Sequence, residues 1–281
     1  MSWTTWYPSP LILDGGAIAL MLFATGFAKL RRRGRRDLAN WPRAALFLLA
    51  VALGTLPLVS PLDEAGDTYL LSAHMLQHVL IGEVAPALAL IALRGPLLFF
   101  VVPGTVLRRL ARLAPLRSAL AFLLRPRVSI ATWALVIGVW HVPAAYDYTL
   151  THQTVHDLAH LSFIAAGLLA WSQIVDPARR KALDIPQRLT CAVAMAAFAV
   201  AVGSVLLFAA PLYPAYAHQG TRLFGLSPIA DQQLAGLVMI GEQLCALALC
   251  AAFLLPARAR ARRAAPPVTV VAPILRPGEA A

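Results

Sequence analysis

The sequence predicts an all-helical membrane protein, a polytopic bundle of seven transmembrane helices with its N-terminus outside and its C-terminus inside. Three observations predict this fold class. Hydrophobic residues make up 59% of the 281 positions, and the mean hydropathy is +0.71. Charged residues make up only 13%, against about a quarter in soluble domains. Finally, seven apolar runs reach or approach the roughly 20 residues that a helix needs to cross a bilayer.

The seven runs divide residues 1–256 into one transmembrane domain without an internal repeat. They are residues 11–30, 44–62, 69–93, 128–142, 155–175, 188–209 and 230–255. The first run follows ten residues without lysine or arginine, so it lacks the basic region of a cleaved signal peptide and should be retained as a helix. The fourth run is short and needs extension toward Pro126 or Ala145.

Residues 97–124 are the ambiguous part of this assignment. They open with the apolar sequence LLFFVVPG and continue with arginines at positions 108, 109, 112 and 117. Such a basic and apolar mixture is typical of an amphipathic segment that lies at the membrane surface. We therefore expect an interfacial stretch here, since an eighth span would invert every later one.

The positions of the basic residues orient the bundle. With seven spans, 23 of the 24 lysines and arginines fall on one side, and the other side holds only Arg222. The positive-inside rule makes the basic side cytoplasmic, as in a bacterial inner-membrane protein. Topology thus explains the net charge of +11 without a nucleic-acid partner. The tail, residues 257–281, is rich in proline and alanine, and we expect it to be disordered in the cytoplasm.

All seven histidines fall on the predicted outer side. His74 and His78 on the third span, and His156 and His160 on the fifth, have i, i+4 spacing, so each pair shares one helix face. Two such pairs can present four imidazoles to one metal ion if the two spans are neighbours, and imidazole suits copper, zinc and iron alike. His141, at the outer end of the fourth span, is a candidate further ligand.

Other polar and sulfur-bearing residues lie on the third, fifth and seventh spans. The candidates are Met75, Glu83, Asp157, Asp231, Met239 and Glu242. Asp157 could orient an imidazole, and a thioether such as that of Met75 favours cuprous ion. Asp231 and Glu242 are 11 residues apart and share one face of the seventh span, where Met239 flanks Glu242. This seam is either a polar core that holds helices together or a proton or cation path toward the outer site.

Five motifs occur in order along residues 70–240. They are HMLQH (74–78), WHVPAAYD (140–147), HDLAHLSFIAAGLLAW (156–171), LYPAY (212–216) and SPIADQQLAGLVM (227–239). Together they resemble the multi-spanning CtaG family of cytochrome c oxidase assembly factors. The resemblance implies a protein that is not an enzyme but assists maturation of a haem–copper oxidase, with copper as its metal. It also implies an oxidase subunit in the membrane as partner, and a periplasmic copper chaperone as a second candidate partner.

Two other functions stay open at this point. A b-type haem protein in electron transfer would use cross-helix histidine pairs as axial ligands, although i, i+4 pairs suit stacked haems poorly. A membrane di-iron oxygenase also uses HxxxH boxes, but such enzymes need more histidines and carboxylates, and their boxes face the cytoplasm. A metal site on the outer side is therefore the favoured reading.

Overall fold

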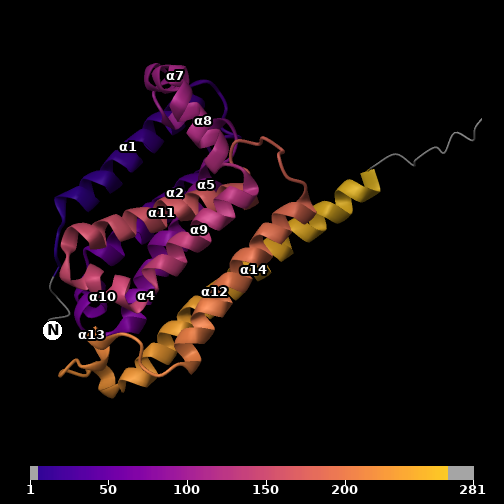
Figure 1. Cartoon of the computed structure of the whole chain (residues 1–281). Coiled ribbons are helices and arrows are strands. Elements are labelled where there is room, and N and C mark those ends of the chain that lie inside the picture. The colour runs from indigo at the N-terminus through magenta and orange to yellow at the C-terminus, as the bar shows by residue number, and fades with distance from the viewer. Residues whose placement is uncertain (1–5, 265–281) are drawn as a thin grey trace, which may run out of the picture.

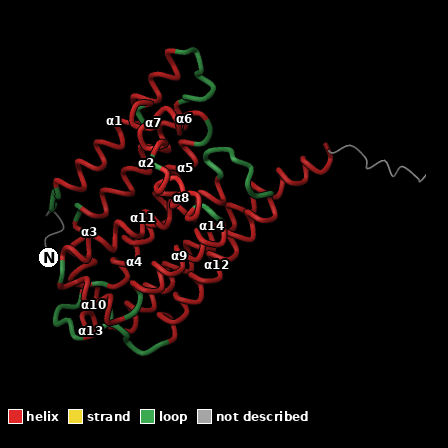
Figure 2. The backbone as a smooth tube through the Cα atoms, turned by 45° about the horizontal axis from the view of Figure 1, so that its top comes forward, coloured by secondary structure: helices red, strands yellow, loops and turns green. Residues whose placement is uncertain are grey.

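Helices form nearly all of the regular structure in the computed structural model, which describes residues 6–264 (Figures 1 and 2). No strand occurs among these residues. The α-helices are α1 (Pro10–Arg32), α2 (Trp41–Thr55), α3 (Pro61–Glu64), α4 (Leu71–Val79), α5 (Ala85–Leu93), α6 (Pro96–Val101), α7 (Gly104–Arg112), α8 (Ala114–Leu123), α9 (Pro126–Trp140), α10 (Pro143–Thr151), α11 (Gln153–Val175), α12 (Ile185–Phe208), α13 (Pro214–Ala217) and α14 (Pro228–Ala264). Two 3₁₀ turns, η1 (Leu56–Leu58) and η4 (Leu223–Gly225), and two π-helical turns, η2 (Ala65–Tyr69) and η3 (Leu80–Val84), complete the chain.

Six helical segments in the described part of the chain are long and apolar enough to cross a membrane. They are Pro10–Arg32, Trp41–Leu58, Leu71–Leu93, Gln153–Val175, Ile185–Phe208 and Pro228–Pro256. The third is continuous through α4, η3 and α5. These segments coincide with six of the seven predicted runs, so the predicted all-helical, multi-spanning fold class is confirmed.

The remaining predicted run, 128–142, corresponds to α9, which is too short to cross a bilayer by itself. Its 15 residues rise only about 22 Å. Helix α8 precedes it after a short break, and the two helices pass the length and hydropathy test together while bent by 79°. The bundle therefore has seven spans if this bent pair counts as one. The orientation relative to a membrane stays a prediction.

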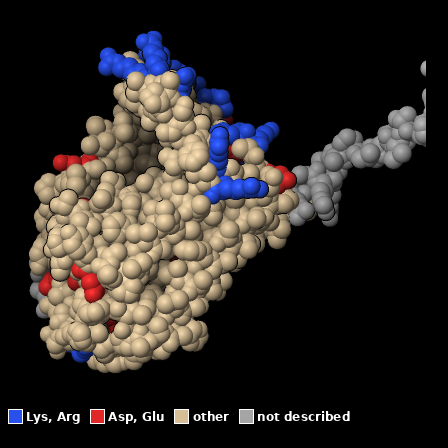
Figure 3. All heavy atoms as spheres, viewed as in Figure 1, with Lys and Arg blue, Asp and Glu red and all other residues tan. Residues whose placement is uncertain are grey.

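The ambiguous segment, residues 97–124, forms the short helices α6, α7 and α8. Helix α7 has no buried residue, and Figure 3 shows lysine and arginine side chains gathered over it at one end of the molecule. Helices α4, α10 and α13 lie toward the other end (Figure 1). Beyond the last span, α14 continues to Ala264, so residues 257–264 are helical where a disordered tail was predicted from residue 257. The rest of that tail, residues 265–281, lies outside the described residues.

Glycines let two pairs of spans meet backbone to backbone. A Cβ atom on Gly167 of α11 would overlap the carbonyl oxygen of Gly82 in η3, and a Cβ on Gly236 of α14 would press on the carbonyl oxygen of Gly203 in α12. Small residues at crossing points allow this close approach in membrane bundles, where van der Waals packing drives association. Helices α12 and α14 accordingly run side by side in both views (Figures 1 and 2).

The buried apolar residues separate into two clusters. The smaller joins α1, α2, α5 and α6, where Phe23 and Phe47 stack with ring centroids 4.2 Å apart. The larger joins α4, α9, α11, α12 and α14 around Trp133 and Phe163. The four paired histidines lie on α4 and α11, within the second region, so the fold brings the third and fifth spans together as the metal-site hypothesis requires.

Candidate metal centre

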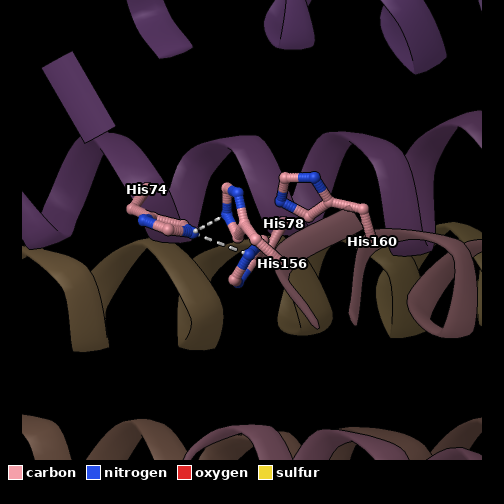
Figure 4. A group of neighbouring side chains, drawn as sticks. All are labelled: His74, His78, His156 and His160. Carbon is pink, nitrogen blue, oxygen red and sulfur yellow. Dashed lines mark hydrogen bonds between the residues drawn. The ribbon is translucent and has the colours of Figure 1, made fainter. Parts of the chain in front are cut away.

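Four histidines meet in the interior between α4 and α11. His74, His78, His156 and His160 each offer one ring nitrogen, and these four atoms lie within 4.8 Å of one another. All four side chains are buried, with at most 9% of their surface exposed. Figure 4 shows the rings side by side, with dashed lines from His74 to His78 and to His156. Among the described residues this is the one such convergence of histidine, cysteine and carboxylate groups; we call it the histidine quartet.

Helix geometry explains why the rings converge. His74, His78 and Gly82 are spaced by four residues, and so are His156 and His160, with Gly167 seven residues further along α11. Residues at these spacings share one helix face. The faces that carry the imidazoles thus also carry the glycines whose backbones touch. Close approach at Gly82 and Gly167 brings the two histidine pairs within reach of each other.

The spacing of the nitrogens fits a small metal ion. Nε2 of His74 lies 2.9 Å from Nε2 of His78 and 3.4 Å from Nε2 of His156. Four nitrogens at about 2 Å from a tetrahedral metal are about 3.3 Å apart. The quartet therefore needs only small side-chain adjustments to place all four nitrogens around one ion.

Tyr216 of α13 fixes which nitrogen of His74 is free to bind. Burial raises the pKa of the Tyr216 phenol well above its usual value, so the hydroxyl keeps its proton. It donates that proton to the carbonyl oxygen of Gly66 at 2.7 Å. Its oxygen, 3.0 Å from Nδ1 of His74, must then accept the Nδ1–H. In that tautomer Nε2 of His74 carries a lone pair toward the quartet, as in many sites where an outer hydrogen bond orients a ligand.

Asp67 is a carboxylate beside the quartet that the sequence analysis did not predict. Its Oδ1 lies 3.5 Å from Nδ1 of His74 and 3.5 Å from Nε2 of His156. Burial, followed by the nearby charges of Asp63 and Asp157, raises the pKa of Asp67 to about 7. Asp157 accepts a hydrogen bond from Gln153 and lines a second cavity together with His156 and His160. The role expected of Asp157, to orient an imidazole, stays a prediction.

Asp231 holds the N-terminus of α4 in place. Its carboxylate accepts the backbone N–H groups of Leu71 and Ser72, at 2.7 and 3.1 Å, and the hydroxyl of Ser72 at 2.5 Å. The first N–H groups of a helix lack partners within it, and a carboxylate there also suits the helix dipole. Asp231 therefore caps, from a distant part of the chain, the helix that carries His74 and His78, and so forms a polar contact between helices.

Glu83 lies deeper, one turn beyond His78, and is held by tryptophans. The indole N–H groups of Trp133 and Trp171 both donate to its carboxylate. It lies in the π-helical turn η3, and such turns often occur at functional positions. Each of its carboxylate oxygens accepts one indole N–H, so it forms a polar contact between α9, α11 and the third span.

A cavity of about 30 Å³ separates Glu83 from the quartet. His78, Glu83, Met75, Met239, His141 and Glu242 are among its lining residues. Nδ1 of His141 donates to the carbonyl oxygen of Ile137 at 2.7 Å, and its Nε2 has no hydrogen-bond partner. His141 and the two methionines therefore line this inner cavity and lie outside the group of four converging nitrogens.

Sequence reasoning missed Asp67, Tyr216, Trp133 and Trp171 as neighbours of the polar residues. Tyr216 belongs to the LYPAY motif, whose sequence alone indicates no contact with His74. Asp67 lies in the short connection that precedes the first histidine pair. Proximity to His74 in the chain was the available signal for Asp67, whereas no local pattern predicts the tryptophan contacts with Glu83.

Comparison with known proteins identifies similar sequences along most of the chain. The family model described as cytochrome c oxidase caa3 assembly factor (Caa3_CtaG) matches residues 21–261. Two proteins described as uncharacterized, one from Mycobacterium bovis and one from Mycobacterium tuberculosis, are each 28% identical over 249 residues. These alignments cover 83% of this chain and 36% of each relative, so the chain spans about a third of the length of these curated relatives. No solved structure matches the chain.

Proposed function

The chain belongs to the cytochrome c oxidase caa3 assembly factor family, and on that premise we propose that it binds copper at the histidine quartet. It then assists maturation of the copper centre of a haem–copper oxidase. It acts as a multi-pass protein of the bacterial inner membrane, with the quartet toward the outer face, and it is not itself an enzyme.

The convergence of four buried imidazoles supports this proposal most strongly. Ionisable groups are costly inside a membrane and mark function by default. A hydrogen-bonded polar core would pair these nitrogens with donors and acceptors. Instead, Nδ1 of His78 and Nε2 of His160 have no hydrogen-bond partner. The converging Nε2 atoms of His74, His78 and His156 contact one another, and a metal ion that replaced these contacts would also bind the free nitrogen of His160.

Copper is favoured over other metals by the combination of site and family. Imidazole ligands alone accept copper, zinc or iron. An assembly factor for cytochrome c oxidase serves an enzyme that contains copper, which selects copper from that set. The haem alternative receives less support, because nitrogens within 4.8 Å of one another, on rings whose centroids are 4.2–6.3 Å apart, are packed against each other and not across a porphyrin.

The partner in this proposal is an oxidase subunit that docks in the membrane. A periplasmic copper chaperone is the proposed source of the metal. The exposed apolar surface of the outer spans, such as Leu135 of α9 and Leu158 of α11, suits contact with lipid or with another membrane protein.

The proposal is tested in cells that lack this protein and carry wild-type or variant copies. We expect oxidase activity and oxidase copper content to fall in the deletion strain and to recover with the wild type but not with His78→Ala or His160→Ala. His218→Ala, an exposed histidine outside the quartet, is the matched control and should restore both. Normal oxidase copper in the deletion strain would remove the assembly role.

A further inference from the structure

A second, wider cavity opens beside the quartet and shares no lining residue with the inner cavity. Its volume is about 440 Å³, within the range of small-ligand sites. His156 and His160 of α11 form part of its wall, together with Asp63, Asp157, Gln153 and Tyr7. The inner cavity instead reaches the quartet at His78. The wider cavity thus touches both histidines of α11, whereas the inner cavity touches the quartet at His78 alone.

The wider cavity is acidic. Asp63 and Asp157 line it, and their charges act on Asp67 beside the quartet. Among the described residues, none of those that line it is a lysine or an arginine. A cleft lined by charges of one sign, with walls of low dielectric constant, raises the local concentration of ions of opposite sign.

A histidine nitrogen without a hydrogen-bond partner lies beside the acidic residues of this cavity. His160 is 93% buried, from an exposed fraction of 7%, and its Nε2 has no hydrogen-bond partner. This nitrogen belongs to a residue that both lines the cavity and contributes to the quartet. Carboxylates alone would not define a site, but here they surround the approach to a buried imidazole with a free nitrogen.

We infer that this cavity is the loading vestibule of the quartet, through which copper arrives as a cation, drawn by Asp63 and Asp157 and captured first by His156 and His160. The inference rests on the proposed copper function. It assigns the pairs different roles, because only the α11 pair is reached from the vestibule. The vestibule residues set the rate of loading, while the four histidines set the affinity.

The test follows the rate at which the purified full-length protein takes up cuprous ion, supplied anaerobically as its cationic acetonitrile complex. In low salt we expect the Asp63→Asn/Asp157→Asn variant to load about five- to tenfold more slowly than the wild type, with the same final copper content. The difference should vanish at about 1 M salt, where the screening length is about 3 Å. Both asparagines keep an oxygen for the hydrogen bonds from Gln77 and Gln153.

A reagent of negative charge provides a second measurement, in which the double variant should have the opposite effect. Removal of bound copper by bicinchoninate, an anionic chelator, should be faster in the double variant, whereas a general loss of access would slow both loading and removal. Asp37→Asn, which removes an exposed carboxylate in the connection between α1 and α2, should change neither rate. Equal loading rates in low salt would overturn the vestibule alone. Failure of the wild type to hold copper would overturn the proposed function and the vestibule with it.

Discussion

The histidine quartet and the Glu83 site are two buried polar clusters on the same span, and they differ in how their hydrogen-bonding capacity is used. Glu83 is held by the indoles of Trp133 and Trp171. In the quartet, Nδ1 of His78 and Nε2 of His160 have no hydrogen-bond partner, and Nε2 of His78 meets another imidazole nitrogen, that of His74. A satisfied polar group in a membrane bundle joins helices, whereas converging unsatisfied lone pairs form a binding site. Burial does not distinguish a structural cluster from a binding site here, because both clusters are buried. The number of hydrogen-bond partners does distinguish them.

Removal of a quartet imidazole should have the largest effect on copper binding. We expect His160→Ala to lower copper affinity at least a hundredfold, because one of four ligand atoms is lost and an apolar gap replaces it. Copper content after desalting measures this, with His152→Ala as control, since His152 stacks on Tyr148 outside the quartet. Equal copper in His160→Ala and wild type would break the contrast between the two clusters.

Displacement of α11 should have the next largest effect. In Gly167→Ala the new Cβ would overlap the carbonyl oxygen of Gly82, so α11 must move away from η3 and carry His156 and His160 with it. We expect lower thermal stability and a large loss of copper affinity. Gly241→Ala, where a Cβ meets nothing within 4 Å, is the matched control. Unchanged copper binding in Gly167→Ala would mean that the crossing does not position the quartet.

Loss of the Tyr216 hydroxyl should have an intermediate effect. Without it, Nδ1 of His74 loses its hydrogen-bond acceptor and the tautomer is no longer fixed. Outer hydrogen bonds of this kind are worth about 10- to 100-fold in metal affinity, which is the loss we expect for Tyr216→Phe in a copper competition titration. The exposed Tyr148→Phe should bind normally. A Tyr216→Phe variant of wild-type affinity would leave His74 oriented by other means.

Substitution at Glu83 should have the smallest effect on copper and a distinct effect on stability. The amide of Glu83→Gln has one oxygen that can accept an indole N–H, and its NH2 group cannot accept the other. One indole therefore loses its partner, at a cost of about 1–3 kcal/mol. Thermal unfolding should shift downward while copper content stays the same. If copper content fell with stability, the two clusters would have to be treated as one coupled unit.

Local patterns in the sequence predict the spans and the histidine pairs but not what surrounds them. Apolar runs are long and uninterrupted, and i, i+4 spacing fixes each pair on one face whatever the tertiary packing. Asp67, Tyr216 and Asp231 reach their partners only after folding; Tyr216 and Asp231 are each more than 140 residues from the α4 groups they bind. Asp157 was favoured because it is near His160 in sequence, whereas the carboxylate within 3.5 Å of His74 and His156 is that of Asp67.

The bent fourth span also shows that local sequence patterns do not predict how helices pack. Hydropathy detects the apolar residues of α9, but the 79° bend from α8 depends on how the two helices pack. The contact of Gly82 with Gly167 likewise depends on which helix faces which. The sequence supplies the ligands of the candidate site, and packing decides that α4 and α11 are neighbours.

Copper K-edge X-ray absorption on the purified protein loaded with one equivalent of cuprous ion tests the central claim most directly. We predict a shell of three to four imidazole nitrogens at about 2.0 Å with no sulfur contribution. A sulfur shell at about 2.3 Å would contradict the account, because it would place copper in the inner cavity with Met75 and Met239 instead of within the histidine quartet.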